Sequence, residues 1–119
     1  MGVPLNLLLL GFVSDRMDIL DWKERPFVSL ELMTAYSARD SDTAKKYGPI
    51  VKAVEISNRD YGYRYSRFSS SRTMRPPPSS HMHIHLGYLV VRKLGTPDQY
   101  ETWMPDHVFD ELYEAASES

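Results

Sequence analysis

Cysteine is absent from this chain of 119 residues, which excludes a disulfide framework, a thiol nucleophile and any metal site with thiolate ligands. Glycine is scarce, and the six glycines form neither a P-loop nor a Gly-x-Gly-x-x-Gly turn. The Gly-x-Ser-x-Gly motif of serine hydrolases is also missing. We therefore expect a binding protein rather than an enzyme, with no cofactor.

Long apolar runs are missing as well. The longest, over residues 5–13, is roughly half of the ~20 residues that a transmembrane helix needs. No basic stretch precedes this run, as it would in a signal peptide. We expect the run to form a buried strand or core-facing segment, and the protein to be cytoplasmic with no membrane partner.

The composition, 42% hydrophobic and 25% charged, is typical of one globular domain over residues 1–119. Caps, breakers and apolar periodicity predict its elements. The fold class is α+β: an antiparallel sheet of three to five strands with N-terminal helices and a C-terminal helix packed on one face. The predicted helices cover residues 15–25, a segment from Pro26 to Ser37 (with a strand over 27–33 as the alternative), a turn at 44–47 and a segment from Pro105 to Tyr113. The predicted strands cover 50–56, 61–68, 81–93 and 100–104, with an exposed, mobile Ser/Arg/Pro-rich loop at 69–80.

Charge is segregated along a nearly neutral chain. The formal net charge is −2, yet residues 58–95 carry seven basic groups against Asp60. Residues 96–119 carry seven acidic groups and no lysine or arginine. Folding could bring the two segments together, or leave a dipolar surface that steers a partner.

A stretch rich in tyrosine and arginine, residues 59–68, is the main candidate for binding. As a hairpin strand it would place Tyr61, Tyr63 and Tyr65 on one face. Such a stripe suits core packing, a protein interface, or single-stranded nucleic acid stacked on aromatic rings beside arginine. The candidate partner-binding residues are Arg59, Tyr63, Arg64, Tyr65, Arg67, Phe68, Arg72 and Arg75.

A second pattern is the alternation of His81, His83 and His85, which a strand would place on one face. Imidazoles in this spacing can bind zinc, with Glu101 on the neighbouring strand as the nearest carboxylate. The alternative is that the three histidines are simply exposed polar residues. The long strand 81–93 could also pair edge to edge in a homodimer.

The C-terminal third contains Gly87-Tyr88-Leu89-Val90, then Thr102-Trp103-Met104-Pro105, with Phe109 and Tyr113 following. This pattern resembles a module of small tailed-bacteriophage accessory proteins, over about 30 residues. The resemblance implies a viral protein that binds a host or phage protein in the host cytoplasm. Modulation or inhibition of a host enzyme or defence complex would be its function, with nucleic-acid binding by the Tyr/Arg hairpin as the alternative.

Overall fold

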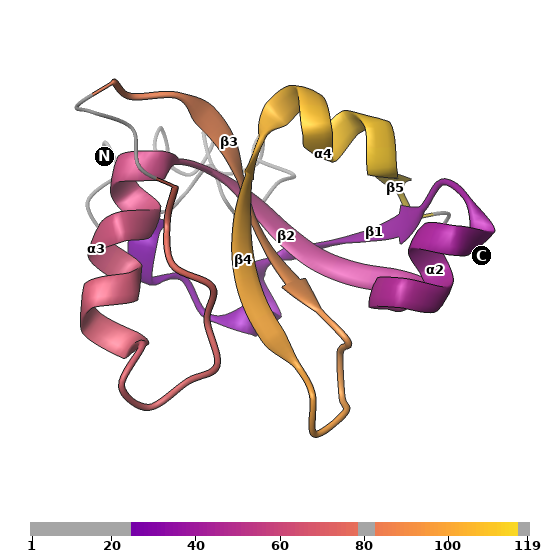
Figure 1. Ribbon diagram of the computed structural model, residues 1–119, viewed down its shortest axis with the longest axis horizontal. Helices are drawn as coiled ribbons and strands as arrows, with labels where there is room; N and C mark the ends of the chain where they lie inside the picture. Colours follow the sequence, from indigo (N-terminus) through magenta and orange to yellow (C-terminus); the bar gives the residue numbers. More distant parts are fainter. Residues whose placement is uncertain (1–24, 79–82, 117–119) are drawn as a thin grey trace, which may run out of the picture.

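The computed structural model describes residues 25–78 and 83–116. They form a five-stranded antiparallel sheet with the strand order β4-β3-β2-β1-β5 (Figure 1). The strands are β1 (Thr34–Ala38), β2 (Ile50–Ser57), β3 (Leu86–Arg92), β4 (Tyr100–Pro105) and β5 (Tyr113–Ala115). The helices are α2 (Ser41–Tyr47), α3 (Asn58–Phe68) and α4 (Asp106–Leu112), preceded by 3-10 turns η2 (Arg25–Phe27) and η3 (Leu30–Leu32).

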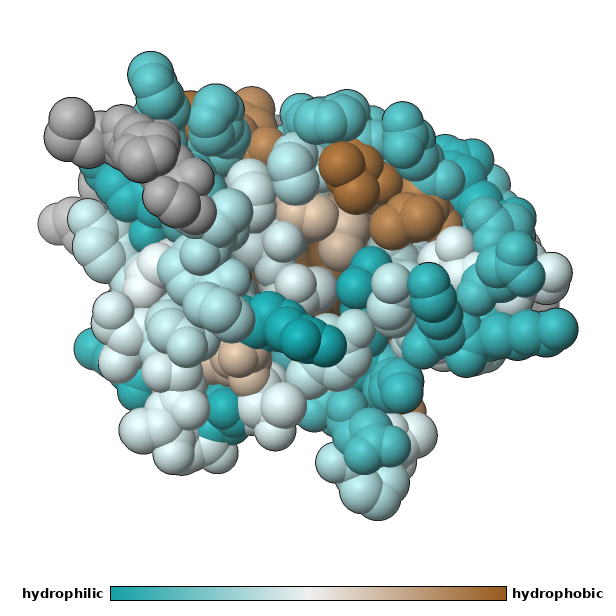
Figure 2. Space-filling model, in the orientation of Figure 1, coloured by the Kyte–Doolittle hydropathy of each residue, from teal (hydrophilic) through white to brown (hydrophobic). Residues whose placement is uncertain are grey.

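Helices cover both faces of the sheet. Successive strand residues point to opposite faces, so the buried residues of β2 contribute side chains to two cores, one on each face of the sheet. On one face Val54 and Ile56 pack with Tyr61 of α3. On the other, Val51 and Ala53 share a core with Phe109 of α4. Hydrophobic side chains reach the surface beside α4 (Figure 2).

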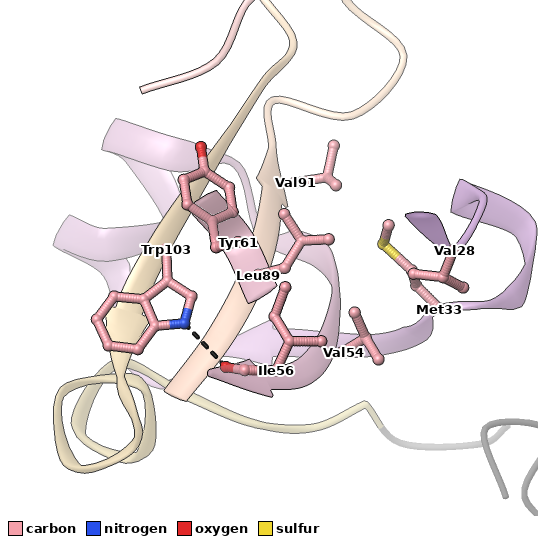
Figure 3. Packing of buried hydrophobic residues seen from close by; sticks show 8 residues of the cluster. All are labelled: Val28, Met33, Val54, Ile56, Tyr61, Leu89, Val91 and Trp103. Atoms are coloured by element: carbon pink, nitrogen blue, oxygen red, sulfur yellow. Dashed lines mark hydrogen bonds between the residues drawn. The ribbon is translucent and has the colours of Figure 1, made fainter. Parts of the chain in front are cut away.

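A glycine in β3 makes room for the largest side chain of the α3-side core. Gly87 pairs with Pro105 of β4 and with Ile56 of β2. A Cβ at Gly87 would overlap the Trp103 indole ring and the Met104 carbonyl oxygen. The indole crosses this gap, and its Nε1–H donates to the Ile56 carbonyl oxygen at 2.9 Å (Figure 3). One side chain of the edge strand β4 therefore spans β3 and reaches β2.

Several predicted elements are confirmed: the α+β class, the antiparallel sheet, β2, β4, and the C-terminal helix on one face. The helical turn predicted at 44–47 is part of α2, which starts earlier, at Ser41, and is capped by Asp40, whose carboxylate accepts from the Thr43 N–H at 2.8 Å. Hydrogen bonds from Thr43 hold the pKa of the Asp40 carboxyl below its usual value. The predictions for residues 1–24 lie outside the described residues.

Three predictions are wrong. Residues 61–68 form a helix, α3, rather than a strand. Residues 26–37 form two 3-10 turns and then β1, because the Pro26 and Val28 carbonyls accept from the buried guanidinium of Arg64 and are not used in helical hydrogen bonds. The strand predicted over 81–93 starts at Leu86 and lies between β2 and β4, so it offers no free edge for a homodimer.

The loop predicted at 69–80 is largely exposed over residues 69–78. It is not free, however, since Thr73 to Arg75 lie along the outer edge of β4. The Glu101 N–H donates to the Thr73 carbonyl at 3.0 Å, and the Arg75 N–H donates to the Glu101 carbonyl at 2.8 Å. Pro76–Pro78 follow, and because proline has no N–H the pairing does not continue along the edge.

We expect Gly87→Ala to lower the free energy of unfolding by about 3 kcal/mol, because the methyl group must displace the Trp103 ring and the Met104 carbonyl. Urea denaturation measures this loss. Gly62→Ala is the matched control: its added methyl meets nothing within 4 Å, and alanine favours the helix, so stability should rise by up to about 1 kcal/mol. Equal effects at the two glycines would contradict this account.

Candidate functional site

The candidate site is built on α3. Ser57 caps the helix, its hydroxyl oxygen accepting from the Asp60 N–H at 3.1 Å. At 100° per residue the helix then has two unlike sides. The core side carries Tyr61, Arg64, Tyr65 and Phe68, and the outer side carries Arg59, Gly62, Tyr63, Ser66 and Arg67.

Arg64 occupies the centre of the core side and is only 1% exposed. Its Nε and Nη2 donate to the two carboxylate oxygens of Glu101 on β4, at 2.6 and 3.2 Å. Its Nη1 donates to the carbonyls of Pro26 and Val28, each at 2.9 Å. Every nitrogen of the guanidinium is thus hydrogen-bonded inside the protein. Arg64 is therefore not available to a partner, contrary to the prediction from the sequence.

The buried pair of Arg64 and Glu101 also acts on two neighbouring side chains, Tyr61 and Arg72. Burial, and then the charge of Glu101, raise the pKa of Tyr61 well above its usual range. The Tyr61 hydroxyl therefore stays protonated and donates to the Arg75 carbonyl. Arg72 reaches the same carboxylate from the surface, at 3.4 Å, with its side chain 43% exposed.

The remaining predicted contact residues divide between core and surface. Tyr65 packs against the α3-side core, and Phe68 meets Phe27 edge to face with ring centroids 6.2 Å apart. Arg67 lies over the Phe27 ring at 4.1 Å, and Arg72 lies over the Phe68 ring at 3.8 Å. The predicted platform of three tyrosines does not form: Tyr61 is fully buried, Tyr65 is half-buried, and Tyr63 is exposed.

A groove of about 360 Å³ runs along the outer side of α3. Residues from Asn58 to Ser66 form one wall, a length of about 12 Å at the helical rise. Pro77, Pro78, His83 and Ile84 form the other wall. Tyr63 and Ile84 are large apolar side chains that remain 53% and 56% exposed in it.

The two walls are held together by Asn58. Its side-chain amide donates to the His83 carbonyl at 3.0 Å and accepts from the His85 N–H at 2.8 Å. Its own backbone N–H donates to the His85 carbonyl at 3.2 Å. The buried Asn58 thus fixes the 83–85 segment beside the first turn of α3, and it was not among the sequence-predicted site residues.

Gly62 forms part of the groove wall. Glycine inside a helix costs about 1 kcal/mol relative to alanine. Nothing lies within 4 Å of the position of its absent Cβ, so core packing does not require a glycine here. The missing side chain leaves this part of the groove open.

The folded chain keeps its opposite charges largely apart. On the outer side of α3, Arg59 and Arg67 are exposed, and neither forms an ion pair within the described residues. The opposite face of the sheet carries the acidic groups of α4 and β5: Asp106, Asp110, Glu111 and Glu114. The two charged segments meet at Glu101, where Arg64 and Arg72 converge, and this contact is mostly buried.

The predicted metal site is not assembled in the part of the chain that the structure describes. His83 and His85 are exposed with ring centroids 6.2 Å apart, and His81 lies outside the described residues. No three metal-ligating side chains gather among residues 25–78 and 83–116. Glu101 is paired with Val91, six residues and about 20 Å along β3 from His85, so its predicted role as a ligand is wrong.

Comparison with known proteins adds nothing to these observations: no family model, curated protein or solved structure is significantly similar to the chain. Within the described residues, no helix has the length and apolarity to cross a membrane.

We expect Glu101→Gln to lower the free energy of unfolding by about 3–5 kcal/mol, because it leaves the Arg64 charge buried without a counter-charge. Chemical denaturation measures the loss. Arg67→Met is the matched control, since it removes an exposed arginine–ring contact worth about 0.5–1 kcal/mol. Similar losses of stability in both variants would show that burying Arg64 without its counter-charge costs no more than losing an exposed contact.

Proposed function

We propose that this protein acts by binding a partner protein through the outer side of α3, and that the partner inserts an extended segment with acidic flanks into the α3 groove. The observation that carries the proposal is the combination, in one groove, of an exposed tyrosine, a helix-weakening glycine and an arginine without a counter-charge. Tyrosine and arginine are the residues most often found at the centres of protein interfaces.

The dimensions of the groove favour a peptide segment. A strand rises about 3.3 Å per residue, so the ~12 Å wall of α3 accommodates about four extended residues. Exposed rings and proline surfaces line the middle of the groove, where one apolar side chain of the partner would be buried. Arg59 lines the groove one helical turn before Tyr63, and Arg67 lies one turn after Tyr63, just outside the lining, so positive charge lies near both ends of the α3 wall.

The resemblance to phage accessory proteins extends this proposal. The partner would be a host or phage protein, and binding would modulate or inhibit its activity. Nucleic-acid binding becomes the weaker alternative, because the stacked platform of tyrosines on which it depended does not form.

The experiment is affinity capture from a bacterial lysate through a C-terminal tag, with and without nuclease, using wild type and matched variants. Arg59→Glu, Tyr63→Ala and Gly62→Gln alter the groove. Lys45→Glu is the control, because it changes the charge of an exposed residue of α2 by the same amount. Thermal unfolding of each variant establishes that it is folded.

We expect one protein to be retained by wild type and Lys45→Glu after nuclease treatment, and its Kd to weaken at least tenfold in each groove variant. A tenfold change corresponds to about 1.4 kcal/mol, within the range of a tyrosine or arginine at an interface centre. A partner that all variants bind equally would exclude the groove. Binding that disappears with nuclease would replace the proposal with nucleic-acid binding.

A further inference from the structure

A second buried arginine lies on the opposite face of the sheet and is unlike the first. Arg92 ends β3 and is 8% exposed. Its Nε donates to the Tyr113 hydroxyl at 3.0 Å and its Nη1 to the Tyr100 hydroxyl at 3.4 Å. Its guanidinium carbon lies 3.6 Å from the centre of the Tyr47 ring. Three tyrosines from α2, β4 and β5 therefore hold this side chain in place.

No carboxylate balances this charge within the described residues, since Arg92 forms no ion pair there. Arginine is almost never buried without a counter-charge, because removing it from water is costly. Two further cations lie beside the tyrosine rings that hold Arg92. Lys46 Nζ lies 5.8 Å from the centre of the same Tyr47 ring, and the Arg75 guanidinium lies 5.1 Å from the centre of the Tyr100 ring.

The hydrogen-bonding groups at this place are donors that remain unused. Nη2 of Arg92 forms no hydrogen bond with another described residue. The hydroxyls of Tyr100 and Tyr113 accept from Arg92, and neither donates to another described residue. Burial raises the pKa of Tyr113, so this hydroxyl keeps its proton at neutral pH.

We propose that Arg92, Tyr100 and Tyr113, with Lys46 and Arg75 beside them, form a binding site for a phosphate group. A planar guanidinium and hydroxyl donors match the oxygens of a phosphate, and three cations around two rings suit a dianion better than a single carboxylate. The ligand would supply the counter-charge that Arg92 lacks. The site is separate from the α3 groove, because Arg92 and Tyr113 lie on the other face of the sheet and no residue of the site lines the groove.

The test is thermal unfolding of the full chain in increasing inorganic phosphate, with sodium chloride holding the ionic strength constant. We expect the Tm to rise with phosphate concentration as mass action requires for binding to the folded state. Parallel titrations in an NMR experiment should move the backbone amide signals of residues 46–48, 92–93 and 100. A second titration with a nucleoside monophosphate distinguishes free phosphate from a phosphate ester.

Lys46→Gln and Arg75→Gln are the first variants, since both residues are exposed and the fold does not depend on their side chains. Each should weaken the Kd for phosphate at least fivefold, whereas Arg67→Gln, on the other face, should leave it unchanged. Arg92→Lys keeps the charge but loses the planar donors, and it should abolish the shift if the variant folds.

Each outcome is decisive. Equal affinity for phosphate and the monophosphate supports a site for the free anion, and tighter binding of the monophosphate supports a site for a phosphate ester. No rise in Tm with either ligand would overturn the proposal. A rise that is the same in wild type, Lys46→Gln and Arg75→Gln would also overturn it, because an adventitious ion effect does not depend on these residues.

Discussion

The ion pair between Arg64 and Glu101 is the contact on which the α3 side of the molecule depends. It joins the middle of α3 to β4, and the same guanidinium donates to the carbonyl oxygens of Pro26 and Val28, which ties the N-terminal turns to the helix. Removing either charge would leave the other buried, so the pair is costly to break even where its net contribution to stability is small. Helix, edge strand and N-terminal turns are held in one arrangement by this single side chain.

This constraint also determines what α3 presents to solvent. With Arg64 directed into the core, Arg59, Tyr63 and Arg67 must face outward, since they lie on the other side of the helix. The acidic groups of α4 lie across the sheet, beyond the second core. A chain with little net charge therefore presents unlike charges beside α3 and beside α4, and we propose that the partner binds beside α3.

Local signals in the sequence predicted much of the fold. Alternating β-branched residues indicated β2, and the polar residues 40–43 indicated a cap for the helical turn at 44–47, which belongs to α2. The strand predicted over 61–68 is wrong, because tyrosines at every second position favour a strand whereas these residues belong to α3. Ser57 and Asp60, three residues apart, form a helix-start signal, and Tyr61, Arg64, Tyr65 and Phe68 have helical spacing. The arginine makes this stripe hard to recognise as the buried side of a helix, since arginine is usually exposed.

The sequence by itself determined the α+β class, the β3–β4 hairpin, the C-terminal helix and the separation of charge along the chain. These features follow from periodicity, caps and composition, which act over a few residues. Only the tertiary structure decided which arginines are buried and which are free. Arg64 is neutralised by a carboxylate 37 positions away, and Arg92 is held by tyrosines from three other elements. Burial depends on such distant neighbours, and no local pattern specifies them.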